Sequence, residues 1–154
     1  MPYTYEYPRP AVTVDVVVFA RRSCSDLAVL LIQRKHAPFE GCWALPGGFV
    51  DEDEALETAA ARELVEETGL AGLTLRQVGA FGDPGRDPRG HTVSVAYMTE
   101  VDADAVMVRA GDDAAKAEWR PWSELRLGAG GTGTALAFDH DRVLLAARAK
   151  LAEE

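Results

Sequence analysis

The sequence contains no long apolar run. A membrane-spanning helix needs roughly 18–20 apolar residues, and the longest apolar stretch, residues 11–20, is interrupted by Thr13 and Asp15. The N-terminus also lacks the basic region followed by an apolar segment that marks a secretory signal. We therefore expect no membrane partner and a cytoplasmic protein.

Cysteine and positive charge are also scarce. The two cysteines, Cys24 and Cys42, have neither metal-binding nor redox spacing, so we interpret them as ordinary thiols. The 25 acidic residues outnumber the 16 basic ones, which gives a net charge of −9. Because this charge repels a phosphate backbone, we expect no nucleic-acid partner. A small phosphorylated substrate stays compatible with it, provided that the acidic residues recruit divalent cations.

The pattern of apolar and turn residues predicts one α/β domain over residues 1–154, with an extended arm at residues 1–10 that is rich in proline and tyrosine. Strands are predicted at residues 11–20, 27–33, 43–45, 73–81, 92–101 and 118–122. Helices are predicted at residues 55–68, with a left-handed cap at Gly69, and at about residues 140–152, with an N-cap at Asp139. A turn is predicted at Pro46-Gly47-Gly48 and a glycine-rich loop at residues 129–134.

The most informative segment is Gly48–Leu70, which has the pattern G, five residues, E, seven residues, R-E-apolar-x-E-E-x-G-apolar. On a helix, Glu63, Glu66 and Glu67 fall within an arc of about 100°. They lie at the C-terminal end, where the helix dipole disfavours negative charge, and Glu63 and Glu67 also repel each other. A solvated acidic face is the alternative interpretation. The cluster instead favours a bound Mg²⁺ or Mn²⁺ ion.

Residues that flank the carboxylates support this interpretation. Arg62 and Glu54 can pair and thereby brace the loop that precedes the helix. The adjacent glycines Gly47 and Gly48 let backbone carbonyls approach a cation closely. Together with the carboxylates, these residues indicate a cation site at one end of the helix.

The segment Gly48–Leu70 resembles the signature of the Nudix hydrolases, and the order of elements along nearly the whole chain is compatible with that family. The resemblance implies a Nudix-type α/β/α sandwich with a mixed central sheet. It also implies attack of water on a pyrophosphate linkage, with Mg²⁺ or Mn²⁺ as the cofactor. By position, Glu63, Glu66 and Glu67 would bind the metal, with the carbonyl of Gly47 as a backbone ligand.

The same resemblance assigns supporting and catalytic roles. Glu54 and Arg62 would form a structural salt bridge, with Gly48 and Gly69 as structural glycines of the signature.

The proton acceptor would be Glu66 or Glu63. Some family members use a carboxylate from a downstream loop instead, and Asp113 is such a candidate metal ligand here, with Asp112 and then Glu118 as alternatives. An ordinary surface carboxylate is the competing interpretation for these three residues.

A second segment, Gly82–Tyr97, carries the residues expected to bind substrate. Its arginines, Arg86 and Arg89, lie in a proline-containing loop and suit a phosphate group. The segment resembles the corresponding region of ADP-ribose pyrophosphatases, which is marked by a proline beyond the signature, and Pro84 and Pro88 are the candidates. A loop with a local arginine–aspartate pair is the alternative.

Other candidate substrate-binding residues lie on the strands. Arg34, at the end of the second strand, is expected to reach phosphate, and an exposed strand-end arginine is the alternative. Tyr97, Phe39 and Trp43 could stack on a purine, with the core or the rim of the site as their other interpretation.

The resemblance implies hydrolysis of ADP-ribose to AMP and ribose 5-phosphate. Together with the extended, aromatic N-terminal arm, it also implies a homodimer that forms through this arm. One alternative is a pyrophosphohydrolase of a nucleoside triphosphate, either an oxidised deoxynucleotide or dihydroneopterin triphosphate. Another is a non-catalytic ADP-ribose sensor. Against the sensor, the signature keeps every carboxylate, and we expect no room for a DNA-binding domain in a chain that ends at Glu154.

Overall fold

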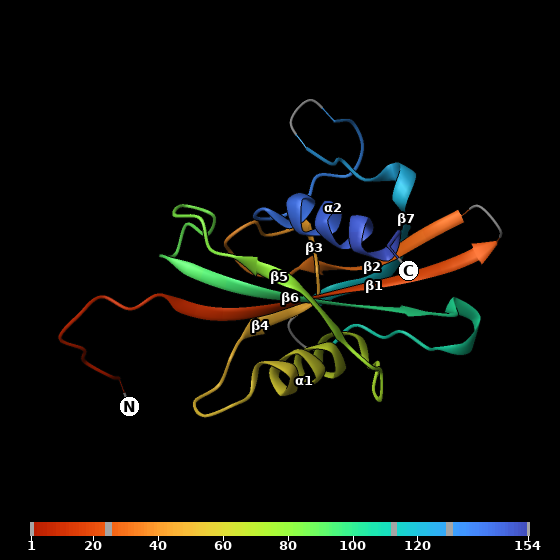
Figure 1. The fold of residues 1–154 in the computed structure, drawn as a ribbon. Helices are drawn as coiled ribbons and strands as arrows, with labels where there is room; N and C mark the ends of the chain where they lie inside the picture. The colour runs from red at the N-terminus through yellow and green to blue at the C-terminus, as the bar shows by residue number, and fades with distance from the viewer. Residues whose placement is uncertain (1, 24–25, 112–113, 129–130, 154) are drawn as a thin grey trace.

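A seven-stranded mixed sheet lies between two helices in the computed structural model, which describes residues 2–23, 26–111, 114–128 and 131–153 (Figure 1). The main strand order is β3-β2-β1-β6-β5, with β4 paired to β1 and β7 paired to β2. The strands are β1 (Ala11–Ser23), β2 (Asp26–Arg34), β3 (Trp43–Ala44), β4 (Gly47–Phe49), β5 (Arg76–Phe81), β6 (Thr92–Val101) and β7 (Ala114–Pro121). The helices are α1 (Leu56–Thr68), α2 (His140–Leu151) and the short 3₁₀ turns η1 (Ala103–Ala105) and η2 (Trp122–Glu124). This arrangement confirms the predicted α/β/α sandwich with a mixed sheet.

Strand β1 is the centre of the sheet. It runs parallel to β6, from Ala11 opposite Thr92 to Ala20 opposite Val101, and antiparallel to β2 and β4. Because both of its faces are covered, its sequence is a nearly continuous apolar run rather than an alternating one. Thr13 and Asp15 interrupt that run, and both line the cavity described below.

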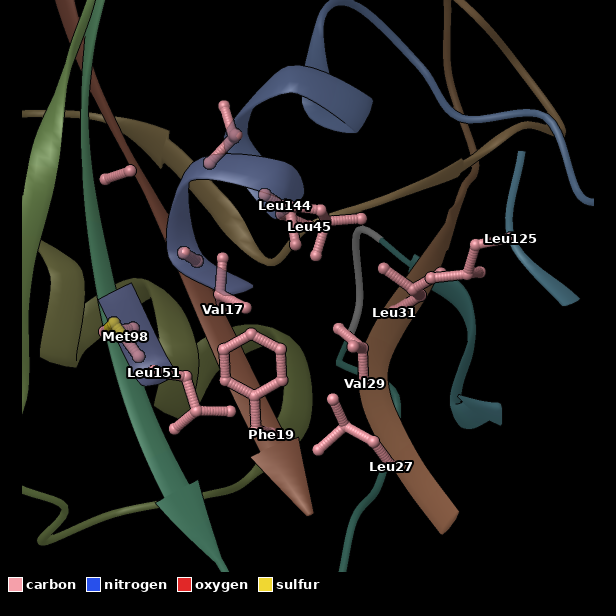
Figure 2. Close-up of a cluster of buried hydrophobic side chains, with 13 residues drawn as sticks. Val17, Phe19, Leu27, Val29, Leu31, Leu45, Met98, Leu125, Leu144 and Leu151 are labelled. Carbon is pink, nitrogen blue, oxygen red and sulfur yellow. The ribbon is translucent and has the colours of Figure 1, made fainter. Parts of the chain in front are cut away.

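The side chains of β1 alternate between two cores. Val14, Val16 and Val18 pack with α1 on one face, whereas Val17 and Phe19 pack with α2 on the other. Figure 2 shows the second core, in which Leu144 and Leu151 of α2 approach the Phe19 side of the sheet. The two helices are therefore fixed on opposite faces of one strand, and their ends define the edges of the site.

The boundaries of most predicted elements hold within a few residues, but the predicted turn at Pro46-Gly47-Gly48 is wrong in part. Residues 47–49 form β4, which pairs with β1 so that Gly47 lies opposite Asp15 and Phe49 lies opposite Thr13. A β-carbon on Gly47 would overlap the carbonyl oxygen of Val14. The absence of a side chain at Gly47 is therefore required for the close pairing of β4 with β1, as well as for a turn.

Other differences arise from contacts distant in sequence. Strand β7 begins at Ala114, four residues before its predicted start, because it pairs along most of β2. Asp139 holds the N-cap position of α2, but its side chain makes no capping hydrogen bond and pairs with Arg86 instead. The predicted loop at residues 129–134 lies partly outside the described residues.

Residues 2–10 form no helix or strand, and the tyrosines among them are exposed. The hydroxyl of Tyr3 donates a hydrogen bond to Glu52 at 2.7 Å, and Arg9 stacks on Tyr5 at 3.9 Å. Among the described residues, no helix is long and apolar enough to cross a membrane.

Gly69 supports a test of the predicted left-handed cap at the end of α1. Its φ is 79°, and its N–H donates to the carbonyl of Val65. Replacing Gly69 with Ala should lower the free energy of unfolding by about 1 kcal/mol, because a β-carbon disfavours this conformation. Denaturant-induced unfolding measures the change.

Gly79→Ala is the matched control, because Gly79 has no positive φ and an added β-carbon would meet no atom within 4 Å. We expect its stability to match that of the unmodified protein. Equal stability of both variants would contradict the role assigned to Gly69.

Candidate active site

A cavity of about 340 Å³ lies where α1, β1, β4, the loop after β5 and the start of α2 meet. Two carboxylates of α1, Glu63 and Glu67, line one part of it. Arginines line another part: Arg34, Arg86 and Arg89. The cavity therefore joins the two groups of residues that the sequence singles out for a cation and for phosphate.

The three carboxylates of the signature do not lie in equivalent positions. Glu63 and Glu67 line the cavity, whereas the side chain of Glu66 is 56% exposed and does not. Within the described part of the chain, no three carboxylate, imidazole or thiol groups converge closely enough to enclose a metal ion. The candidate ligand Asp113 and its neighbour Asp112 lie outside the described residues.

Arg62 explains this arrangement. Its guanidinium donates to both oxygens of Glu54, at 2.7 and 2.9 Å, so the structure brings the predicted structural pair together. The same group donates to Glu63 at 2.9 Å, to Glu66 at 3.2 Å and to the carbonyl of Phe49 at 3.1 Å. The hydrogen bonds from Arg62 lower the pKa of Glu54 to about 2. Arg62 thus ties the loop before α1 to two of the three signature carboxylates.

The electrostatic state of the two half-buried carboxylates, Glu63 and Glu67, favours a bound cation. Burial, and next the nearby charge of Glu63, raises the pKa of Glu67 to about 8, and burial also raises the pKa of Glu63. The N–H of Gly47 donates weakly to Glu67 at 3.4 Å. A β-carbon on Gly48 would come within 2.6 Å of the carboxylate of Glu63, so this glycine leaves space for that group. Two desolvated carboxylates beside each other fit Mg²⁺ or Mn²⁺ in their oxygen chemistry.

The two arginines of the loop after β5 differ in their freedom to bind a ligand. Arg86 donates two hydrogen bonds to Asp139, at 3.0 and 2.6 Å, and its side chain is 4% exposed. Arg89 makes a similar pair with Asp87, but its own side chain is 42% exposed. Arg86 therefore anchors the loop to the start of α2 while it lines the cavity, and Arg89 lies closer to solvent.

Arg34 lies between these groups. Its Nε donates to the carbonyl of Pro38 at 2.7 Å, and its guanidinium lies 5.0 Å from the ring of Phe138. Burial, and next the charge of Arg89, lowers the pKa of Arg34. A negatively charged ligand in the cavity would relieve the repulsion between these two arginines.

None of the three aromatic candidates for purine stacking lines the cavity: Phe39 contacts the ring of Phe138, Trp43 packs against the core on the α2 side of the sheet, and Tyr97 lies in the core on the other side. Tyr97 is 5% exposed and packs in the core beneath α1, together with Val16 and Leu64. It does not line the cavity. Its place on β6, which is buried along most of its length, directs the ring into the core rather than toward a ligand.

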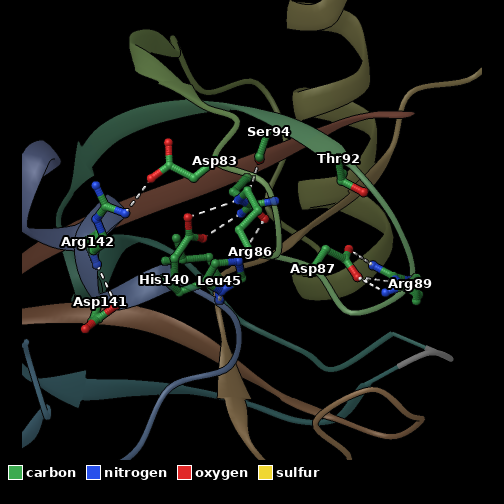
Figure 3. A network of polar contacts seen from close by, with 12 residues as sticks. Leu45, Asp83, Arg86, Asp87, Arg89, Thr92, Ser94, His140, Asp141 and Arg142 are labelled. Atoms are coloured by element: carbon green, nitrogen blue, oxygen red, sulfur yellow. Dashed lines mark hydrogen bonds and ion pairs between the residues drawn. The ribbon is translucent and has the colours of Figure 1, made fainter. Parts of the chain in front are cut away.

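Sequence reasoning missed a buried polar group on the cavity wall (Figure 3). Asp15 accepts a hydrogen bond from Ser94, and its other oxygen lies 3.4 Å from Nε2 of His140. The N–H of Leu45 donates to Nδ1 of His140 at 3.0 Å, so the ring proton belongs on Nε2, facing Asp15. Burial opposes ionisation of Asp15, but His140 and Ser94 outweigh it and lower the pKa of this carboxyl. A single acidic residue within the valine run of β1 was the available signal.

Glu67 allows a test of the desolvated carboxylate in metal-free protein. Its pKa is about 8 in the folded state against 4.5 ordinarily, so folding takes up a proton between these values. The stabilising effect of that proton is complete below pH 4.5 and is lost as the pH rises through about 8. In the presence of a chelator, Glu67→Gln should therefore melt at a higher temperature than the unmodified protein at pH 8, and at a similar temperature at pH 4.5. Parallel pH profiles of Tm for the two proteins would contradict this burial of charge.

Comparisons with known proteins show the family of the chain. The family model of the NUDIX domain matches residues 9–140. An ADP-ribose pyrophosphatase of Methanocaldococcus jannaschii is 41% identical over 138 residues, which are 90% of this chain and 73% of that protein. An ADPR-responsive transcriptional repressor, NtrR of Acinetobacter baylyi, is 38% identical over 95% of this chain, and the match spans only 56% of the repressor's length.

Solved structures lead to the same family. The NUDIX domain of Shewanella oneidensis NrtR, in complex with ADP-ribose, superposes with a TM-score of 0.82 at 34% identity, over 94% of this chain and 90% of that one. A MutT/nudix family protein from Enterococcus faecalis superposes with a TM-score of 0.85 at 32% identity, over 99% of this chain and 66% of that one. These matches confirm the resemblance carried by the segment Gly48–Leu70, and the chain belongs to the NUDIX domain family.

Proposed function

We propose that this protein hydrolyses ADP-ribose to AMP and ribose 5-phosphate. The observation that carries the proposal is the single cavity that Glu63 and Glu67 line together with Arg34, Arg86 and Arg89. A pyrophosphate linkage needs both positive charge around its oxygens and a site for activated water. Similarity to an ADP-ribose pyrophosphatase over 90% of the chain supports ADP-ribose as the substrate.

In this proposal, Glu63 and Glu67 hold a divalent cation, Mg²⁺ or Mn²⁺, with Glu66 and the carbonyl of Gly47 as further ligands. The cation would neutralise charge on the phosphoryl oxygens and lower the pKa of a bound water. In this structure Glu66 pairs with Arg62 at 3.2 Å, at an exposed position where an ion pair is weak.

The arginines of the cavity would orient the substrate. Arg34 and Arg89 repel each other in the free protein, and a pyrophosphate between them removes that repulsion. Arg86 contributes positive charge from a fixed position, because Asp139 holds its guanidinium by two hydrogen bonds. Together they would offset the negative charge of the two phosphates, which an acidic chain otherwise repels.

A carboxylate would accept the proton of the attacking water. The water oxygen forms a bond to one phosphorus atom while the bridging P–O bond of the anhydride breaks, and the departing phosphate retains the bond electrons. Of the two predicted acceptors, Glu63 lines the cavity, and Glu66 does not. Position therefore favours Glu63 as the acceptor.

The substrate assignment is tested by product analysis. With Mg²⁺ or Mn²⁺, the protein should convert ADP-ribose to equal amounts of AMP and ribose 5-phosphate, resolved by anion-exchange chromatography. Chelation of the cation should stop the reaction. Release of inorganic pyrophosphate from nucleoside triphosphates, without turnover of ADP-ribose, would instead identify the triphosphate pyrophosphohydrolase.

The carboxylate cluster is tested by Glu66→Gln. The side chain is 56% exposed, so the variant should fold with an unchanged Tm, while kcat should fall by at least about 100-fold. Glu57→Gln is the matched control, because Glu57 lies exposed in the first turn of the same helix and does not line the cavity. Full activity of Glu66→Gln would remove this residue from the proposed cation site.

A second candidate function is ADP-ribose sensing, favoured by the similarity to a repressor described as ADPR-responsive and by the fold of an NrtR domain in complex with ADP-ribose. A sensor binds ADP-ribose and leaves it intact. Calorimetric titration beside the product assay separates the two functions, because binding without AMP formation in the presence of Mg²⁺ would replace the enzymatic proposal with sensing.

A further inference from the structure

Two phenylalanines of the cavity wall hold a planar group against their rings. Phe49 ends β4 and is 45% exposed, and Phe138 lies just before α2. Both line the cavity. The guanidinium carbon of Arg89 lies 4.9 Å from the ring centroid of Phe49 and 5.6 Å from that of Phe138. One flat cation thus contacts two aromatic rings that come from segments far apart in the sequence.

The backbone at Phe138 is strained, and contacts of its ring with neighbouring side chains hold it in this conformation. Its φ is 53°, in the left-handed region that a bulky side chain rarely adopts. The ring is held by Phe39 at 4.9 Å, by His140 at 5.3 Å and by the guanidinium of Arg34 at 5.0 Å. Such strain persists where several contacts fix it, and it is concentrated at ligand-binding positions. The contacts keep this ring in place at the cavity wall.

The position of the Arg89 guanidinium also suits a nucleotide base. Aromatic rings contact each other at centroid distances of about 4.5–7 Å, a range that includes both distances from this position. A purine placed there would therefore contact both rings. Neither ribose nor phosphate has a flat apolar face, so these parts of ADP-ribose gain less from the two phenylalanines.

Arg89 is the more accessible half of its ion pair. Its side chain is 42% exposed, whereas the side chain of Asp87 is 2% exposed. The backbone N–H of Arg89 also donates to Asp87 at 2.9 Å, so this carboxylate keeps a hydrogen bond when the guanidinium moves away. The guanidinium would keep water as a partner after it leaves the rings, and it would then be available to a phosphate of the same ligand.

We propose that the base of the nucleotide stacks between Phe49 and Phe138 in the place that the Arg89 guanidinium holds in this structure, and that Arg89 is displaced on binding. The identity of the ligand as an adenine nucleotide rests on the proposed function. The base would lie at the aromatic part of the cavity, and the pyrophosphate would extend toward Glu63 and Glu67.

Adenosine, AMP and ribose 5-phosphate are the probes that test this proposal, because only the first two carry a base. Titrations followed by NMR would measure affinity together with the upfield ring-current shifts of the adenine H2 and H8 protons. Phe49→Leu and Phe138→Leu should each weaken adenosine and AMP binding by about 3- to 10-fold and reduce these shifts. Binding of ribose 5-phosphate should be unchanged in both variants.

Phe39→Leu is the matched control. Phe39 contacts the ring of Phe138 but does not line the cavity, so its loss should leave the adenine shifts nearly intact. Arg89→Ala adds an independent measurement: adenosine should bind at least as tightly as to the unmodified protein, because a competitor for the rings has been removed. A weakened affinity of Arg89→Ala for adenosine would overturn the displacement of Arg89.

The two proposals fail separately. If the unmodified protein hydrolyses ADP-ribose but Phe49→Leu and Phe138→Leu bind adenosine normally, the base does not stack between these rings and the proposed function is unaffected. If adenosine binding depends on both rings but ADP-ribose is not cleaved, the stacking site stands and the proposed activity fails. Equal loss of adenosine and ribose 5-phosphate binding would indicate general damage to the cavity and overturn the stacking site.

Discussion

The close pairing of β4 with β1 is the constraint on which the rest of the site depends. Gly47 lies so near β1 that a β-carbon would overlap the carbonyl of Val14, and the next residue, Gly48, leaves space for the carboxylate of Glu63. One strand of three residues therefore contacts the central sheet with one glycine and the signature helix with the other. The same strand ends at Phe49, whose carbonyl accepts a hydrogen bond from Arg62 and whose ring lines the cavity. Without two residues that lack side chains, α1 could not bring its carboxylates to the cavity.

Local ion pairs, rather than the net charge of the whole chain, determine the charge of the site. The protein carries a net charge of −9, yet three arginines line the cavity. Arg86 is neutralised by Asp139 and Arg89 by Asp87, so the positive groups are held without a bound anion. Glu67, in the acidic part of the cavity, has no comparable ion-pair partner, and its pKa is raised to about 8 mainly by burial. In the free protein, the side of the cavity with Glu67 therefore favours a positive charge that is not present. On the other side, the charges of Arg86 and Arg89 are screened by their aspartate partners.

What could be predicted from the sequence was local. The helix α1, its cap at Gly69 and the pairing of Arg62 with Glu54 follow from spacings of a few residues, and the structure contains all three. Contacts between distant segments could not be read in the same way. Arg86 and Asp139 are 53 residues apart, and no periodicity links them. Tyr97 carries an aromatic ring and a hydroxyl that suit a ligand, but which face of β6 is buried depends on where α1 packs.

The start of α2 is a point where several segments are tied together. Asp139 binds Arg86, His140 binds the N–H of Leu45, and Arg142 binds Asp83 (Figure 3). The cavity therefore takes one of its walls from the last helix, although the signature ends at residue 70. During synthesis, a nascent chain exposes the signature long before this wall exists. The cavity can form only after the segment through His140 has been synthesised, so a chain that stopped after residue 70 would carry the family's most recognisable segment without this cavity.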